Sequence, residues 1–114
     1  MGRYYVLRDG KVIEEPDHDS WLAWYQSTYK EVEMVAETRL ANCTVTTRFL
    51  GMNLTLVRDA EPQVFETKVS GGWLGSQHER FATLDEARQG HDKWVSRVRE
   101  IQAENQLPPP GATW

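Results

Sequence analysis

The chain has 114 residues, of which 39% are hydrophobic and 26% are charged, and its net charge is −4 with an isoelectric point near 5.3. A chain of this length and composition is expected to form one globular domain that buries its apolar surface without cross-links. The acidic balance argues against a nonspecific nucleic-acid binder, because neutralising phosphates requires clustered lysine and arginine. We therefore expect no direct contact with nucleic acid.

The cysteine content and the first residues limit the chemistry and the compartment. Cys43 is the only cysteine, so a disulfide within the chain and a cysteine cage for zinc are both excluded. His18, His78 and His91 share no metal-ligand spacing, so we expect neither a metal nor a cofactor. The opening MGRYYVLRDG contains no long apolar run, which predicts a cytoplasmic protein without a signal peptide or membrane span.

The N-terminal part of the chain predicts a hairpin followed by a helix. Residues 4–7 and 11–14 flank Asp9-Gly10, a dipeptide that supplies the positive φ angles of a type I′ turn. Asp17 or Asp19 can cap a helix that runs to about residue 28. The apolar positions of this helix recur three and four residues apart: Trp21, Leu22, Trp24, Tyr25 and Tyr29.

The middle of the chain predicts further strands. Residues 33–40 and 44–50 surround Ala41-Asn42 and form a second hairpin, since the TVTTRFL segment is dense in β-branched and aromatic residues. Residues 64–69 are predicted as another strand, and residues 79–82 as its partner.

The last helix begins at a capping box, Thr83 to Glu86, in which the hydroxyl and the carboxylate each bind a backbone N–H. Its apolar face is Leu84, Ala87, His91, Trp94, Val95, Val98 and Ile101. Gly90 is unfavourable within a helix, which indicates close packing against a strand or a partner. The three prolines at 108–110 predict an extended tail over residues 107–114.

These elements predict an α+β fold in a single domain over residues 1–106. The expected architecture is an antiparallel sheet of about five to six strands, with two helices packed on one face.

No combination of side chains predicts catalysis. Cys43 lies beside a turn and has no cysteine-hydrolase signature around it, although His78 or His91 could in principle pair with it. Glu66 and Glu79 could form a carboxylate pair, but two acids on neighbouring strands usually face solvent. His91 lies on the apolar face of the last helix, where a hydrogen-bonded histidine in the core or at a pocket edge is expected. We therefore expect a protein that is not an enzyme.

The segment SGGWLGS, residues 70–76, allows two interpretations. It is not a P-loop, because no GK[ST] follows and no helix begins within it. It can be a plain hairpin connection. Alternatively, it can be a binding lid in which the amides of Gly71 and Gly72 face an anion and Trp73 stacks on a ring.

Three arginines suggest an anion site near this segment. Arg48, Arg58 and Arg80 could converge on one patch, and planar guanidinium groups suit phosphate and carboxylate. Isolated arginines are usually solvated, so the convergence is a hypothesis about the fold. Trp21, Trp24 and Tyr25 could line the same pocket or form a core stripe. The predicted binding residues are Arg48, Arg58, Glu66, Gly71, Gly72, Trp73, Arg80 and His91.

Four segments in this order, RYYVLRDG, VTTRFLG, VFETKVSGG and ERFATLDEARQGH, resemble a family of small uncharacterised proteins of tailed bacteriophages and prophages. Those proteins read like STVFLG, then LFETMVFGG, then a closing helix with Gly-His, and the match covers most of residues 3–95. This chain departs after Gly51, where MNLTLVRDAEP replaces Asp-His and a glycine-rich turn. No role for an acid or histidine at that point can therefore be transferred.

The resemblance implies a phage accessory protein that acts in the cytoplasm of the infected bacterium. Small accessory proteins of this kind with aromatic–arginine pockets often counter host defence, some by sequestering cyclic nucleotide signals, which is an analogy at the level of the family. The leading hypothesis is a non-enzymatic binder of a small nucleotide-like anion that forms a homodimer or a multiple of dimers. The alternative is an acidic protein that binds or inhibits a host or phage protein, since tryptophan and tyrosine are enriched in interface hot spots.

Overall fold

The computed structural model describes residues 3–54, 61–72 and 74–106. The predicted tail at 107–114 and the predicted site residues Arg58 and Trp73 lie outside these ranges. The elements in chain order are β1 (Tyr5–Arg8), β2 (Lys11–Glu14), α1 (His18–Ser27), α2 (Tyr29–Val32), β3 (Met34–Leu40), β4 (Cys43–Phe49), β5 (Phe65–Gly71), β6 (Gln77–Phe81) and α3 (Leu84–Gln106).

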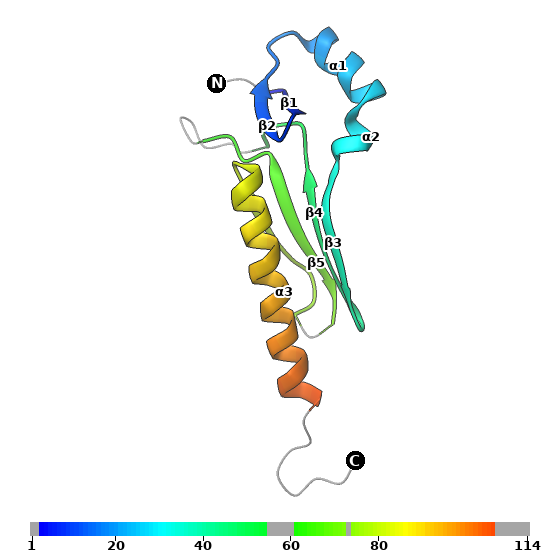
Figure 1. The fold of residues 1–114 in the computed structure, drawn as a ribbon, viewed down its shortest axis with the longest axis vertical. Coiled ribbons are helices and arrows are strands. Elements are labelled where there is room, and N and C mark those ends of the chain that lie inside the picture. Colours follow the sequence, from blue (N-terminus) through cyan, green and yellow to red (C-terminus); the bar gives the residue numbers. More distant parts are fainter. Residues whose placement is uncertain (1–2, 55–60, 73, 107–114) are drawn as a thin grey trace, which may run out of the picture.

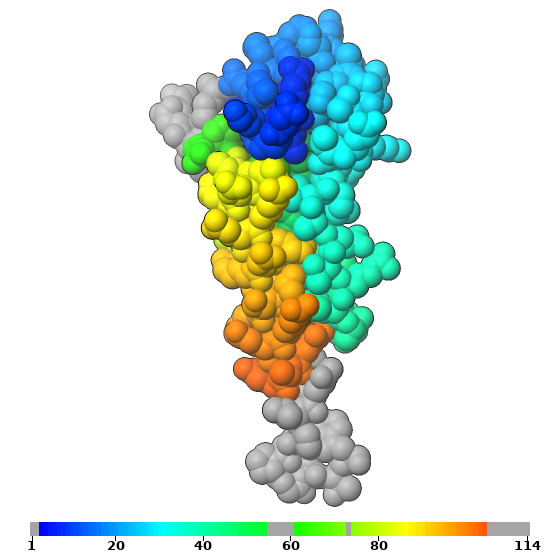
Figure 2. Space-filling model, viewed as in Figure 1, coloured from blue at the N-terminus to red at the C-terminus, as the bar shows by residue number. Residues whose placement is uncertain are grey.

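The predicted α+β class is confirmed, and the strands divide between two antiparallel sheets. The β1–β2 hairpin forms one sheet, and the other has the order β3-β4-β5-β6. Helix α3 lies along one face of the four-stranded sheet, whereas the hairpin, α1 and α2 gather at one end of it (Figure 1). The space-filling view shows the same division, with α3 beside β3 below the N-terminal elements (Figure 2).

The N-terminal hairpin and α1 form as their local sequence predicts. Asp9 and Gly10 have φ angles of 50° and 76°, which the two-residue turn requires. Asp17 caps α1, and its carboxylate accepts a hydrogen bond from the Ser20 N–H at 3.1 Å. The buried Trp21 indole donates to the carbonyls of Tyr5 at 3.0 Å and Gly51 at 3.1 Å. This side chain therefore ties α1 both to the hairpin and to the segment after β4.

The four-stranded sheet has one buried face and one open face. Along β4 the buried residues alternate with half-buried ones, and the buried positions at Val45, Thr47 and Phe49 face α3. Strands β4 and β5 pair over seven positions without a register shift. Because side chains alternate between the two sides of a strand, Thr46 and Arg48 lie on the face opposite α3.

Helix α3 begins at the predicted capping box. The Glu86 N–H donates to the Thr83 hydroxyl oxygen at 3.1 Å, as expected. The Glu86 carboxylate differs from the prediction, because it accepts from the Thr83 hydroxyl at 3.2 Å instead of from the Thr83 backbone.

The predicted close packing at Gly90 is against a strand. A Cβ atom added to Gly90 would lie 2.0 Å from Cζ of Phe81, the last residue of β6. The ring of Phe81 therefore occupies the space that any other side chain at position 90 needs. Gly90 is therefore explained by packing within the protomer, and it gives no support to close packing against a second subunit.

Gly90→Ala should destabilise the protein, although Gly→Ala substitutions inside helices normally stabilise. Overpacking against Phe81 costs about 1–3 kcal/mol, which exceeds the gain of about 1 kcal/mol in helix propensity. Urea unfolding measures the difference. Gln89→Ala, at the exposed neighbouring position, is the control and should be nearly neutral. A Gly90→Ala protein more stable than the wild type would contradict this packing.

Candidate functional site

The open face of the sheet carries a row of charged side chains. Arg48 on β4, Glu66 on β5 and Arg80 on β6 occupy register-paired positions. The Arg80 Nε donates to the Glu66 carboxylate at 3.2 Å. The structure therefore places two of the three predicted arginines on the same face, with Glu66 between them.

Arg48 points towards the N-terminal elements instead of towards Glu66. Its Nη1 donates to the Glu33 carboxylate at 3.3 Å, and its side chain remains 43% exposed. A guanidinium group has five N–H donors, so one ion pair leaves donors for a ligand. Glu33 was not among the predicted site residues.

Arg48 lines a cleft between the sheet and the two short helices. The cleft has a volume of about 480 Å³ and is lined by Tyr25, Gln26, Tyr29, Lys30, Glu33 and Arg48. This volume lies within the range of about 300–1,000 Å³ that is usual for small-molecule sites. The cleft therefore combines aromatic rings, two cations and one carboxylate.

The aromatic wall of the cleft is a stacked pair of tyrosines. The ring centroids of Tyr25 and Tyr29 lie 4.5 Å apart with an interplanar angle of 22°. The Tyr29 hydroxyl donates to the Phe49 carbonyl at 2.8 Å, and burial raises the pKa of Tyr29 to about 12. Tyr29 is thus a fixed, neutral ring, whereas Tyr25 is 41% exposed and can contact a ligand.

The tryptophans of α1 do not line this cleft. Trp21 and Trp24 are buried and belong to the core cluster around Phe49 and Phe65. Of the three aromatic residues on α1 predicted as possible pocket residues, Tyr25 is the one that lines this cleft.

The glycine segment lies at the far end of the sheet from Arg48. Gly71 pairs with Cys43 and lies five positions after Glu66 along β5, a distance of about 17 Å along an extended strand. A Cβ atom on Gly71, whose φ is 80°, would lie 2.5 Å from the Asn42 carbonyl oxygen. The structure therefore does not bring Gly71 and Gly72 into one pocket with the arginines, and the close approach of Asn42 accounts for Gly71.

His91 lies on the opposite side of the sheet, under α3. It is buried, its Nδ1 is hydrogen-bonded to the Thr47 hydroxyl at 2.7 Å, and its Nε2 to the Thr38 hydroxyl at 2.9 Å. The Thr47 hydroxyl is also bonded to the buried Thr67 hydroxyl. Burial lowers the pKa of His91, although Asp92 opposes this shift. His91 is therefore a neutral core residue bonded at both ring nitrogens, and it lies away from the cleft.

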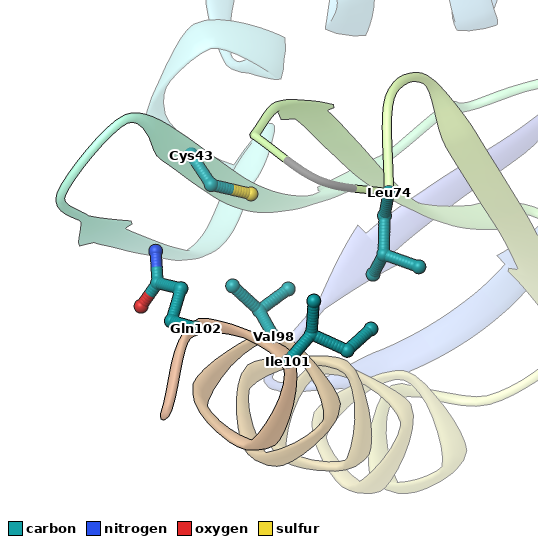
Figure 3. A pocket seen from close by; sticks show the side chains of 5 residues that line it. All are labelled: Cys43, Leu74, Val98, Ile101 and Gln102. Atoms are coloured by element: carbon teal, nitrogen blue, oxygen red, sulfur yellow. The ribbon is translucent and has the colours of Figure 1, made fainter. Parts of the chain in front are cut away.

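The side chains considered for catalysis are not arranged for it. Cys43 adjoins a cavity of only about 10 Å³, lined also by Leu74, Val98, Ile101 and Gln102 (Figure 3). Burial raises the pKa of the Cys43 thiol, which disfavours the reactive thiolate. Glu66 and Glu79 occupy successive positions of facing strands and point to opposite faces: Glu66 binds Arg80, and Glu79 accepts from the Trp94 indole at 3.0 Å.

Over residues 3–54, 61–72 and 74–106, no group of three or more histidine, cysteine, aspartate or glutamate side chains could hold a metal ion. Within the same ranges, no helix is long and apolar enough to cross a membrane. Comparisons with protein-family models, curated proteins and solved structures find no match to this chain.

The buried neutral His91 should make stability depend on pH. The unfolded chain takes up a proton near the ordinary pKa of 6.5, whereas the folded protein resists protonation to a lower pH. The unfolded state therefore binds more protons in this window, so the free energy of unfolding should fall as the pH is lowered through 6.5 and below. Urea unfolding at a series of pH values measures the slope.

His91→Asn should remove this part of the slope, while the equivalent change at the exposed His78 should leave it in place. Hydrogen bonds from Ser20 hold the pKa of the Asp17 carboxyl below its ordinary value of 3.8. Protonation of Asp17 therefore changes the free energy of unfolding only at a more acidic pH. An unchanged slope in the His91→Asn protein would show that another group is responsible.

Proposed function

We propose that this chain is a non-enzymatic binding protein that holds a small, planar, nucleotide-like anion in the cleft between α1–α2 and the sheet. The observation that carries the proposal is the cleft itself, which places an exposed tyrosine ring beside Lys30 and Arg48 in about 480 Å³. Tyr25 can contact a ring, and Lys30 and Arg48 can bind an anionic group of the same ligand.

The ring of the ligand would pack against the exposed part of the Tyr25 ring. Tyr25 is held between Tyr29 and Trp21, with ring centroids 4.5 and 5.0 Å away, and the Tyr29 hydroxyl donates to the Phe49 carbonyl. The binding surface therefore requires little rearrangement. Stacking of a base on an aromatic side chain contributes about 1–3 kcal/mol.

The anionic group would bind Lys30 and Arg48. Lys30 and Arg48 outnumber the single carboxylate of the cleft, that of Glu33, so the lining has a net charge of +1 in a protein whose net charge is −4. Arg80 lies two strands from Arg48, about 10 Å away at ordinary strand spacing. A ligand with a second, distant phosphate could reach it, at the expense of the Arg80–Glu66 ion pair.

The resemblance to tailed-phage proteins supports a setting for this activity. In that setting the chain is an accessory protein of the infected bacterial cytoplasm that sequesters a cyclic nucleotide signal and so counters host defence. This step rests on analogy with other small phage proteins.

A panel of cyclic and linear nucleotides should contain at least one that raises the unfolding temperature. A ligand at 100 times its dissociation constant stabilises the folded state by about 2.7 kcal/mol. Arg48→Ala and Tyr25→Ala should each abolish the shift. Arg39→Ala, an exposed arginine of β3 paired with Glu37, and Leu22→Ala, an exposed residue of α1, should retain it. Absence of a shift with every nucleotide would rule out the proposed ligand class.

A second candidate is an acidic protein that binds or inhibits another protein. The observation in its favour is the exposure of large apolar side chains, namely Ile13, Leu22, Tyr25, Met34 and Leu54. Recovery of one stoichiometric protein partner from infected cells, with no nucleotide bound, would favour this candidate.

The proposal includes a two-fold dimer, because exposed apolar side chains on α1 and β3 are suited to an interface between copies. Light scattering at micromolar concentration should give about twice the protomer mass of 13.2 kDa. Leu22→Glu, at an exposed position of α1, should shift the protein towards monomer if this helix forms the interface. A clean monomer in the wild type would contradict the dimer.

A further inference from the structure

Strand β6 is an uninterrupted edge of the four-stranded sheet. In the described part of the chain, no strand pairs with its outer side. It pairs with β5 at every position from Gln77 to Phe81 without a register shift. The opposite edge, β3, is interrupted by a shift between Met34 and Ala36. Bulges of that kind protect an edge from further pairing, and β6 lacks this protection.

A groove follows the surface of α3 beside this edge, and Phe81 is the residue of β6 that lines it. The Phe81 ring covers Gly90, and the Glu79 carboxylate binds both the Trp94 indole and the Lys93 ammonium, the latter at 3.2 Å. Two adjoining hollows of about 230 and 260 Å³ lie along this contact and share Lys93. The lining extends from Phe81 and Glu86 at one end to Trp94 and Arg97 at the other.

The length of the groove matches a short strand. The 11 residues from Glu86 to Arg97 rise by about 16 Å along the helix. An extended segment of about five residues spans the same distance, and β6 itself has 5 residues. An added strand could therefore pair along the whole of β6 while its alternate side chains contact α3.

The charges beside β6 favour an acidic occupant. Lys93 and Arg97 on the α3 side are 66% and 57% exposed. On the open face, Lys68 and His78 are exposed at paired positions of β5 and β6. Lys93 is paired with Glu79 and Arg97 with Glu100, and the residues that line the groove include two cations and one carboxylate, that of Glu86. Exposed ion pairs contribute little to stability, so Lys93 and Arg97 can exchange these partners for acidic side chains of an occupant. Acidic side chains on either side of an incoming strand would therefore meet a cation.

The same charges disfavour a second copy of this chain at β6. A two-fold pairing over the whole strand would place Glu79 opposite Glu79, given the sequence QHERF. Like charges directly opposite each other destabilise a strand pair. A segment of a different protein can avoid this pairing of Glu79 with itself.

We propose that β6 and the adjacent α3 groove bind an extended acidic segment of another protein as an added β-strand. Backbone hydrogen bonds to the β6 edge provide affinity, as in other complexes formed by strand addition. Lys93 and Arg97 select acidic side chains, and the Phe81 and Trp94 rings accept apolar side chains between them. This surface is separate from the cleft at Arg48, so it can be occupied whether or not a small ligand is bound.

The probe is a set of synthetic peptides of about six residues in which glutamate alternates with valine or phenylalanine. At least one should bind in a calorimetric titration and slow hydrogen exchange of the β6 amides. The Lys93→Glu, Arg97→Glu double variant should weaken this binding at least about tenfold. The matched control is Arg88→Glu, Arg99→Glu on the exposed surface of the same helix, which should bind like the wild type.

Two peptide controls distinguish strand addition from charge attraction. N-methylation of alternate residues removes the hydrogen-bond donors of one strand edge and should abolish binding, and replacement of glutamate by lysine should do the same. Equal binding of the N-methylated peptide, binding without protection of β6, or no binding by any peptide at millimolar concentration would overturn the proposal. Protection of β6 that rises with protein concentration alone would instead show that a second copy occupies the edge.

Discussion

The close approach of α3 to the sheet at Gly90-His91 determines how the rest of the molecule is arranged. The ring of Phe81 occupies the space beside Gly90, and the next residue bonds through its two ring nitrogens to threonines on β3 and β4. A further hydroxyl contact extends this network to Thr67 on β5. Buried polar groups of this kind are costly unless satisfied, so α3 has little freedom to slide or rotate. One face of the sheet is consequently filled by α3, and the surfaces proposed for binding lie at the N-terminal end and at the β6 edge.

This arrangement gives a structural role to three of the sequence segments singled out above, VTTRFLG, VFETKVSGG and ERFATLDEARQGH. Thr47 of VTTRFLG, Thr67 of VFETKVSGG and Gly90-His91 of the closing helix meet in one buried cluster. Two phenylalanines of the same segments, Phe49 and Phe65, are fully buried in the adjoining core. These segments therefore build the fold, and their distinctive residue types need no catalytic explanation. The proposed cleft is lined largely by other residues, those of α1 and α2.

The sequence was sufficient to predict elements whose signals are local. The Asp9-Gly10 turn, the Asp17 cap and the Thr83 cap each depend on neighbours within three residues, and all three are present. The cleft could not be predicted in this way, because Tyr25 and Arg48 meet through the packing of α1 and α2 on β4, and four-residue α2 has no periodic pattern. The shared face of Arg48, Glu66 and Arg80 depends on strand register over 32 residues. Without that register, the sequence suggests that the glycine segment lies near these arginines. In the structure the segment lies at the far end of β5.

A crystal structure of the protein with a ligand shows whether the cleft between Tyr25 and Arg48 is a ligand site. The protein should be purified from bacterial cells without a denaturing step and crystallised with the nucleotide that stabilises it most. We expect electron density for a ring against Tyr25 and for an anionic group at Lys30 and Arg48. A ligand bound elsewhere, with the cleft empty, would contradict this expectation.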